Sequence, residues 1–487
     1  MDLKKISFGR DTAEFDRNLT EYFLRTPTYT HVIEGHRAIV TGRKGTGKTA
    51  LLRYCQETEN PSHQYVITIE ASHSTYVKID ENLRGFTSQI KNLDSSFKLG
   101  WLFTTLLALV DRLVAEKTMY VSKDERDLYD LAQKEFHYSK DDPIAALSGY
   151  IFNWIGDLKK IGPIERKLDT SRHAEVFDEP RLVNLIRAAI QRVNQKGKKV
   201  LLFYDKLDER WDGTPLHTAF LQGLLLAVRE IKATGLDVAP VVLLRDDIFD
   251  AVTADFQHID HFRMEIEPLT WDERSLMDLI ALRVSTSLSA TGTPTQGMSA
   301  EELWAIPFPE KIPARKQAIP TYAYMIERTL FRPRDIILFA NLVRDATLKN
   351  RRNQATVDDI AEAETQYSQM KLRDLIAEMS YKYPRLDNFL THFRKSTIGF
   401  DIDDLRILVI QAKEAQASPP PWMVAPEDDI IRVLYTIGFL AYTTRGGVLR
   451  GTRVVHSAVD SDPDTILSQK RAYVSPIFRR ALELRDH

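Results

Sequence analysis

Cysteine is almost absent from this chain of 487 residues, in which Cys55 is the single example. A disulfide within the chain and a cysteine-rich metal site are therefore excluded, and a reducing compartment, the cytoplasm, is expected. Long apolar runs are also missing: the longest, Trp101 to Val110, has about half the length of a membrane span and is followed by Asp111. We interpret this run as a core helix. Because the N-terminus also lacks the apolar segment of a signal peptide, we expect no membrane partner.

The chain also lacks an excess of charge of either sign, because 66 Lys and Arg side chains nearly balance 68 Asp and Glu side chains. Net charge therefore indicates no strongly acidic or basic partner, and DNA is not indicated by charge. No internal repeat or low-complexity tract is present. The chain is too long for one ordinary core, so we expect about two to four domains.

The run from Gly42 to Thr49, GRKGTGKT, fits the phosphate-binding pattern G-x-x-x-x-G-K-[ST] and lies between a strand-like run and a helix-like run. Glycines let the backbone bring its N–H groups close to a polyanion, and the following helix directs its positive N-terminal end at the same phosphates. We expect Lys48 to reach the β- and γ-phosphates of ATP and Thr49 to place its hydroxyl on Mg²⁺. The predicted nucleotide contacts are Gly42, Lys44, Gly45, Thr46, Gly47, Lys48, Thr49 and Ala50.

A second element of the same site follows the strand-like run Val200 to Tyr204, which closes on Asp205. The carboxyl edge of a parallel sheet would bring this carboxylate to the Mg²⁺ shell beside Thr49. We therefore predict Thr49 and Asp205 as the metal ligands.

Hydrolysis also needs a group that orients the attacking water, and many P-loop ATPases place an acid directly after the metal-side Asp. Here that position is Lys206. Asp208 and Glu209 are the nearest substitutes, and Asp208 is preferred because it is closer to the strand end. Either one could instead cap a helix or pair with Arg210. Slow turnover is the expected consequence.

The run from Asp205 to Asp208 superficially resembles the [NT]KxD loop that reads guanine in GTPases. Asp replaces the first residue of that pattern, and no convincing switch-region motif lies between this run and the P-loop. We therefore expect ATP rather than GTP.

The remaining patterning predicts an α/β fold: a P-loop NTPase core with a parallel, doubly wound sheet, followed by helical regions. Strands are expected at 37–41, 64–72, 199–204 and 239–244, and helices at 11–25, 49–56 and 181–193, with a helical insertion near 75–175. Past Arg263 we expect the strands to stop. The predicted domains are the core at 1–265, a helical lid at 266–375 and a winged-helix-like domain at 376–487.

Five segments carry a family resemblance: GRKGTGKTALL, the DxLDE that ends the second strand of the site, VVLLRDD (241–247), EIEPLTWDERSLMDLIALRV (265–284) and FRPRDIILFANL (331–342). Together they resemble bacterial P-loop ATPases related to the AAA+, STAND and KAP groups. They are most similar to a poorly characterised family whose members often lie near phage-defence genes. The resemblance spans residues 7–368.

The resemblance implies that Arg245 is a sensor or an arginine finger for a γ-phosphate, unless it forms a salt bridge to Asp246 or Asp247. It also implies that Arg334 is a sensor-2 arginine at the start of a lid helix, with Arg332 as the alternative. The departure at Lys206 puts rapid hydrolysis in doubt.

The C-terminal part is similar to a winged helix. An apolar helical run at 430–442 is followed by a turn at Arg445, an extended segment at 448–455 and a wing strand at 472–475. From Asp401 onward, 11 Lys and Arg residues stand against 12 Asp and Glu residues. This balance favours protein docking or oligomer formation over DNA reading.

These features favour a Mg-ATP-binding switch ATPase whose lid closes on nucleotide and whose closed state forms a homo-oligomer or engages an effector. The family likeness implies that the effector is encoded nearby and acts in phage defence. The alternative is a DNA-binding ATPase of the initiator or clamp-loader type. A small-molecule kinase is a third hypothesis.

Overall fold

The computed structural model of the chain describes residues 3–59, 63–71, 76–77, 93–116, 120–136, 138–139, 143–144, 147, 178–208, 211–313, 318–445, 452–457 and 460–485. The chain divides into two compact units. The core unit is Arg25–Leu269, and the helical unit is Met1–Leu24 together with Thr270–His487. Each unit has its own hydrophobic core.

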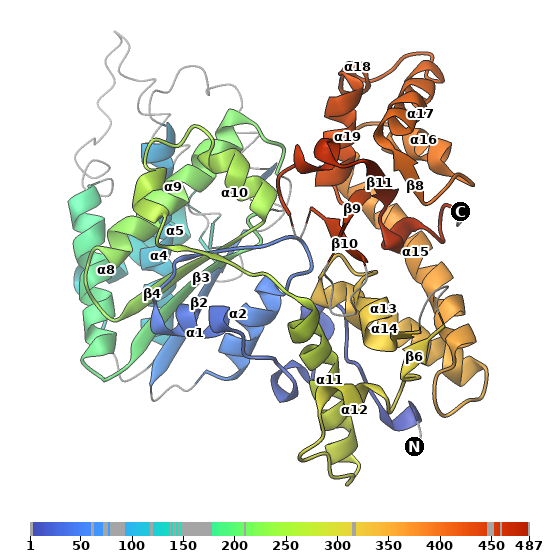
Figure 1. Cartoon of the computed structure of the whole chain (residues 1–487). Helices are drawn as coiled ribbons and strands as arrows, with labels where there is room; N and C mark the ends of the chain where they lie inside the picture. Colours follow the sequence, from blue (N-terminus) through green and yellow to red (C-terminus); the bar gives the residue numbers. More distant parts are fainter. Residues whose placement is uncertain are drawn as a thin grey trace. The chain divides into compact units, whose positions relative to one another are not determined.

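A parallel sheet forms the centre of the core unit, with the strand order β2-β3-β4-β1-β5 in the part of the chain that is described (Figure 1). The strands are β1 (Ile39–Thr41), β2 (Gln64–Glu70), β3 (Lys199–Asp205), β4 (Val238–Leu244) and β5 (Ile266–Pro268). β4 is buried along its whole length, as its continuous apolar sequence predicts for a strand covered on both faces.

Helices cover both faces of this sheet. They are α1 (Pro27–Glu34), α2 (Lys48–Glu57), α4 (Leu93–Ala115), α5 (Lys123–Glu135), α8 (Glu179–Asn194), α9 (Pro215–Lys232) and α10 (Asp246–Thr253). Thr105 of α4 shares a hydrogen bond of 2.8 Å with the hydroxyl of Tyr204, whereas Thr49 of α2 donates to Asp205. Successive residues of a strand point to opposite faces, so α4 and α2 lie on opposite sides of β3 and the sheet is doubly wound.

The helical unit contains α11 (Glu273–Ala290), α12 (Ala300–Trp304), α13 (Thr321–Ile326), α14 (Pro333–Lys349) and α15 (Val357–Met379), with the short hairpin β6 (Lys311–Ile312) and β7 (Ile319–Pro320). The N-terminal segment belongs to this unit because Ile6 and Phe8 are part of its hydrophobic core. Arg344 of α14 also donates to the backbone oxygen of Ile6 at 2.8 Å, and Asn341 donates to that of Gly9 at 2.9 Å. The sequence-based division had assigned this segment to the core.

The C-terminal part of the helical unit has an antiparallel sheet with the described strand order β10-β9-β11-β8. Its elements are α16 (Leu386–Leu390), β8 (Gly399–Asp401), α17 (Ile402–Glu414), α18 (Pro421–Val424), α19 (Glu427–Thr436), β9 (Leu440–Arg445), β10 (Thr452–His456) and β11 (Arg471–Val474). A strand, two longer helices and then three strands therefore follow one another along the chain.

The predicted α/β class, the P-loop strand and helix, and the core helix at Trp101 to Val110 are confirmed. The helix expected at 11–25 is wrong: the chain forms the 3-10 turns η2 (Ala13–Phe15) and η3 (Leu19–Glu21) instead. Tertiary contacts override the helical pattern there, because the buried Asp16 accepts from the Tyr22 hydroxyl and pairs with Arg283 at 3.4 Å.

One further expectation about strands is wrong. The strands do not stop at Arg263, because β5 pairs in parallel with β1; three residues are too few to show a strand period. The apolar run at 430–442 is helical as far as Thr436, since Gly438 adopts a left-handed φ of 81° and β9 then begins. Much of the predicted insertion, including 148–177, lies outside the described residues.

Candidate functional site

The P-loop joins the end of β1 to the start of α2 and needs glycine at defined places. Gly45 and Gly47 have φ angles of 89° and 102°, a region that residues with a Cβ rarely adopt. A Cβ on Gly42 would lie 2.6 Å from the Oγ1 of Thr46. The sequence thus forms a tight loop whose backbone can approach a ligand closely.

Lys48 folds back over this loop. Its Nζ donates to the backbone oxygens of Gly42 at 2.6 Å and Arg43 at 3.3 Å. Burial lowers the pKa of Lys48, and the negative charges of Asp208, Asp246 and Asp205 oppose that shift. A partly buried cation that donates to backbone carbonyl groups is well prepared to bind an anion.

Asp205 lies at the carboxyl end of β3 beside the first turn of α2. The hydroxyl of Thr49 donates to its Oδ2 at 3.3 Å. Burial, together with the charges of Glu70 and Asp208, raises the pKa of Asp205 to about 6, although the backbone N–H of Lys206 and the charge of Lys48 act in the opposite direction. The structure therefore brings together the two residues that the sequence predicts as metal ligands.

These residues fit a Mg-nucleotide complex better than an isolated metal ion. Mg²⁺ is usually held by one or two carboxylates together with substrate phosphates. Among the described residues, no group of three or more His, Cys, Asp or Glu side chains is placed to hold a metal. One carboxylate and one hydroxyl beside a phosphate-binding loop are the protein ligands expected when Mg²⁺ binds together with a nucleotide.

The structure describes one of the two candidate hydrolytic acids, Asp208, and does not describe the other, Glu209. Asp208 lies near the site, since its charge acts on both Lys48 and Asp205. Glu209 lies outside the described residues, so its role stays a prediction.

Arg245 follows β4 at the same sheet edge, and its guanidinium donates to both carboxylate oxygens of Asp247 at 3.0 and 2.7 Å. This is the salt bridge that the sequence analysis weighed against a γ-phosphate contact. Asp246, which sequence reasoning did not assign to the site, faces the P-loop more directly. Burial raises its pKa, whereas the charge of Lys48 and a hydrogen bond with Thr41 lower it.

Arg334 belongs to the helical unit, where its Nε donates to the backbone oxygen of Asp11 at 3.4 Å. The neighbouring alternative, Arg332, has a buried Nε for which the described residues provide no hydrogen-bond partner. Contact of either arginine with a nucleotide stays a prediction.

Sequence reasoning also missed an ion pair next to Asp205. Nζ of Lys206 lies 2.5 Å from Oε2 of Glu70, the last residue of β2. The signal was available in principle, because Glu70 ends a predicted strand at the edge where the other site residues gather.

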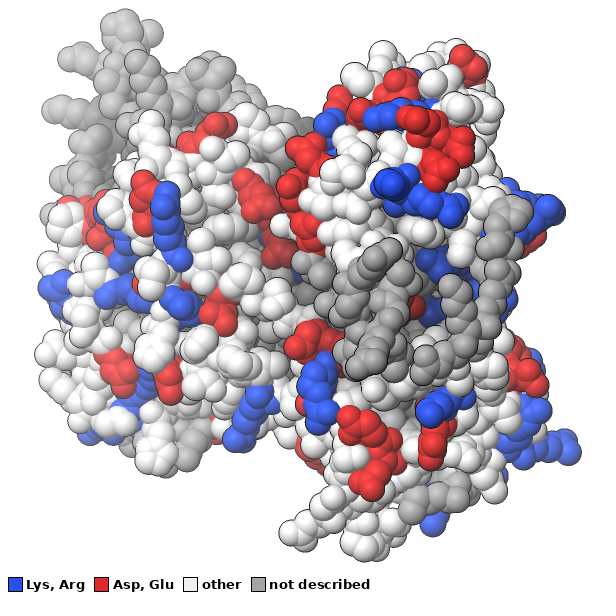
Figure 2. Space-filling view, in the orientation of Figure 1, with Lys and Arg blue, Asp and Glu red and all other residues white. Residues whose placement is uncertain are grey.

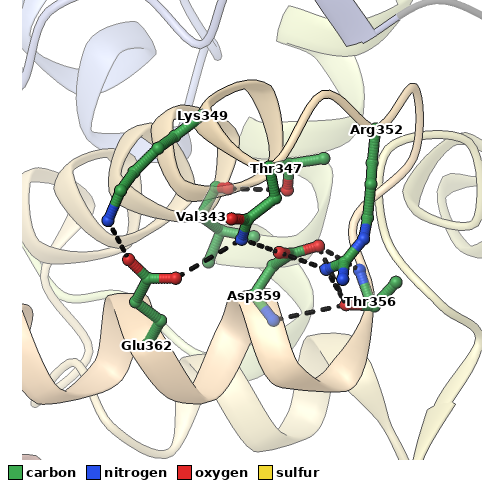
Figure 3. A network of polar contacts seen from close by, with 8 residues as sticks. Val343, Thr347, Lys349, Arg352, Thr356, Asp359 and Glu362 are labelled. Carbon is green, nitrogen blue, oxygen red and sulfur yellow. Dashed lines mark hydrogen bonds and ion pairs between the residues drawn. The ribbon is translucent and has the colours of Figure 1, made fainter.

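The basic run at 349–352 in the helical unit is engaged in internal pairing. Lys349 donates to Glu362 at 2.7 Å and Arg352 donates to Asp359 at 2.6 Å (Figure 3). On the face drawn in Figure 2, basic and acidic side chains of the described residues are interspersed on each unit. None of the described helices is both long and apolar enough to cross a membrane.

The comparison with protein families matches a part of the helical unit. The family model "FunZ-associated C-terminal helical domain" matches residues 274–376, which include α12 to α14 and most of α11 and α15. A curated relative, the "Putative transposon gamma-delta 80.3 kDa protein" of Escherichia coli (strain K12), is 25% identical over 407 residues. This alignment covers 80% of the chain and 54% of the relative, so the chain spans about half the length of that protein.

Three solved structures show distant likeness to the chain. Cdc6p from Pyrobaculum aerophilum is 12% identical with a TM-score of 0.31, covering 96% of this chain and 99% of that one. The ORC2 protein of Aeropyrum pernix in its ADPNP–ADP complexes is 12% identical with a TM-score of 0.34, covering 93% and 99%. Drosophila ORC bound to DNA is 11% identical with a TM-score of 0.24, covering 91% and 82%. At these scores the likeness does not identify a function.

Proposed function

We propose that this protein is a Mg-ATP-binding P-loop ATPase that works as a nucleotide-dependent switch of assembly. The observation that carries the proposal is the contact between Thr49 of the P-loop helix and Asp205 of β3. This contact brings a hydroxyl and a carboxylate together, and the partly buried ammonium group of Lys48 lies over the P-loop.

The proposed roles follow from this arrangement. Lys48 would exchange its carbonyl partners for the β- and γ-phosphates, and the backbone N–H groups of residues 44–50 would surround them. Thr49 and Asp205 would hold Mg²⁺. The bound Mg-ATP would supply a phosphoryl group open to attack by water, and Asp208 would orient that water.

Slow turnover belongs to the proposal. A cation, Lys206, occupies the place directly after the metal-side carboxylate, and Arg245 is engaged with Asp247. A site built this way would hold its nucleotide longer than a fast hydrolase, and a long-lived bound state suits a switch. Arg245 and Arg334 are the proposed γ-phosphate sensors.

The helical unit would provide the surface through which the protein assembles. We infer a winged-helix-like domain from the order β8, α17, α19, β9, β10 and β11, with balanced charge favouring a protein surface or a second copy as its partner. The effector would be a protein encoded nearby and active in phage defence, a link that comes from the family resemblance.

A DNA-handling ATPase of the initiator or clamp-loader type is the second candidate. Two observations favour it. The first is the winged-helix-like order of strands and helices in the C-terminal part, and the second is a curated relative whose printed name assigns it to a transposon. DNA binding that weakens steeply with salt, together with hydrolysis stimulated by DNA, would support this candidate, and no binding at low salt would remove it.

Particle size measured without nucleotide, with Mg-ADP and with Mg-ATP tests the switch. We expect a larger particle only with Mg-ATP, a longer-lived one in Asp208→Asn, and none in Lys48→Ala. Lys196→Ala is the control, since Lys196 is an exposed residue in the turn after α8. Nucleotide-independent assembly of Lys48→Ala would contradict the switch.

A further inference from the structure

The ion pair between Lys206 and Glu70 lies on the phosphate-binding face of the core sheet. Glu70 is the register partner of Asp205 across β2 and β3. Two residues before Glu70, Thr68 accepts a hydrogen bond of 2.7 Å from Gln56 of α2. Side chains alternate between faces with a period of two, so Glu70 shares the α2 face with Asp205.

Lys206 is held beside Asp205 by its backbone. Its φ angle of 58° is in the left-handed region, which is unfavourable for a residue with a Cβ. Its backbone N–H also donates to the carboxylate of Asp205, which lowers the pKa of that group against the larger effect of burial. Costly backbone geometry of this kind persists where surrounding contacts fix it, and it clusters at ligand sites.

The contact of Lys206 with Glu70 is open to competition from another anion. The exposed fraction of the Lys206 side chain is 35% and that of Glu70 is 38%, so the pair is partly solvated. Ion pairs of this exposure contribute little to stability, because solvent screens the two charges. A terminal phosphate is a stronger competitor than one carboxylate because it has more negative charge and more acceptor oxygens.

We propose that Lys206 is a ligand for the terminal phosphate of a nucleoside triphosphate and that Glu70 restrains it in the nucleotide-free protein. The proposal rests on the function proposed above. Binding of the triphosphate transfers the ammonium group of Lys206 from Glu70 to the terminal phosphate. The carboxylate of Glu70, at the end of β2, then loses its ion pair, and this change distinguishes the triphosphate-bound state. A diphosphate lacks the terminal group and leaves the pair closed.

Two substitutions test this because they remove the same ion pair. A merely structural pair predicts that Glu70→Gln and Lys206→Met change nucleotide affinity in the same direction. The proposal predicts opposite directions for Mg-ATP: Lys206→Met binds about tenfold more weakly, and Glu70→Gln binds up to about fivefold more tightly. Affinity for Mg-ADP stays unchanged in both variants, and Lys206→Arg retains the wild-type preference for ATP.

Calorimetry of Mg-ATP and Mg-ADP binding measures these affinities, and nucleotide-free melting temperatures show whether each variant is folded. Equal Mg-ATP affinity in Lys206→Met and wild type, or shifts of one sign in both variants, would overturn the role of Lys206 while leaving the P-loop function intact. Wild-type protein that binds no Mg-ATP would instead overturn the proposed function itself.

Discussion

The pKa values of charged side chains shift in opposite senses in the two units of this protein: one example in the helical unit favours the ionised form, whereas two in the core unit favour the neutral form. In the helical unit, the buried Glu364 accepts hydrogen bonds from the Tyr324 hydroxyl at 2.6 Å and from Nε of Arg328 at 2.7 Å. Burial alone would raise the pKa of Glu364, but the charge of Arg328 and the hydrogen bonds from Tyr324 and Arg328 together outweigh it, and the pKa is lowered. At the carboxyl edge of the core sheet, burial raises the pKa of Asp205 and lowers that of Lys48.

The difference separates charges that stabilise the fold from charges that are ready for a ligand. In the helical unit, the charge of Glu364 is compensated by protein groups, the guanidinium of Arg328 and the hydroxyl of Tyr324. In the core unit the site disfavours the ionised forms of both Asp205 and Lys48, and a ligand with phosphates and a metal would reverse both effects. Opposite effects of mutation on stability should therefore distinguish the two regions.

The largest expected effect is at Glu364. Glu364→Gln removes the nearer of the two carboxylates that pair with Arg328, whose side chain is 12% exposed, and breaking a buried pair costs about 3–5 kcal/mol. The matched control is Glu362→Gln, two residues earlier on α15, where the side chain is 46% exposed and no comparable loss is expected. Hydrogen exchange of α13 and α15 measures the loss, and equal protection in both variants would show that the network does not stabilise the unit.

A change of opposite sign is expected at Asp205. Its pKa is about 6 in the folded chain against 3.8 for the free group, so the folded state binds more protons between these values. Stability therefore falls as pH rises through this window, by about 3 kcal/mol in total at about 1.36 kcal/mol per pKa unit.

Asp205→Asn should remove this cost. Without nucleotide, we expect the variant to be more stable than wild type at about pH 8, with a smaller difference at about pH 5. Urea unfolding at the two pH values measures it, with the exposed Asp255→Asn as control. A variant that is less stable than wild type at the higher pH would place Asp205 among the structural charges.

The smallest effect is expected at Lys349, whose side chain is 72% exposed and pairs with Glu362 (Figure 3). Solvent screens such a pair, so Lys349→Ala should leave the melting temperature unchanged within measurement. A clear loss of stability would mean that surface charges in this unit contribute more than the comparison allows.

The sequence was sufficient to predict the approach of Thr49 to Asp205, because the P-loop pattern and the apolar strand before Asp205 both have local signatures. Glu70 and Asp246 were missed because their importance depends on strand register and on which face each side chain occupies, neither of which is encoded by a local pattern. The pairing of Arg245 with Asp247 was left open for a similar reason: spacing permits both the salt bridge and a phosphate contact. The N-terminal helix failed because contacts of Asp16 with distant residues outweigh the local helical period.

The most direct test of the central claim is calorimetric measurement of Mg-ATP binding to the nucleotide-free wild-type protein, Lys48→Ala and Lys196→Ala. The account predicts binding to wild type and Lys196→Ala that requires Mg²⁺, and at least about tenfold weaker binding to Lys48→Ala, since a charged hydrogen-bonding partner is lost. Equal binding to Lys48→Ala and wild type, or no binding to wild type, would contradict it.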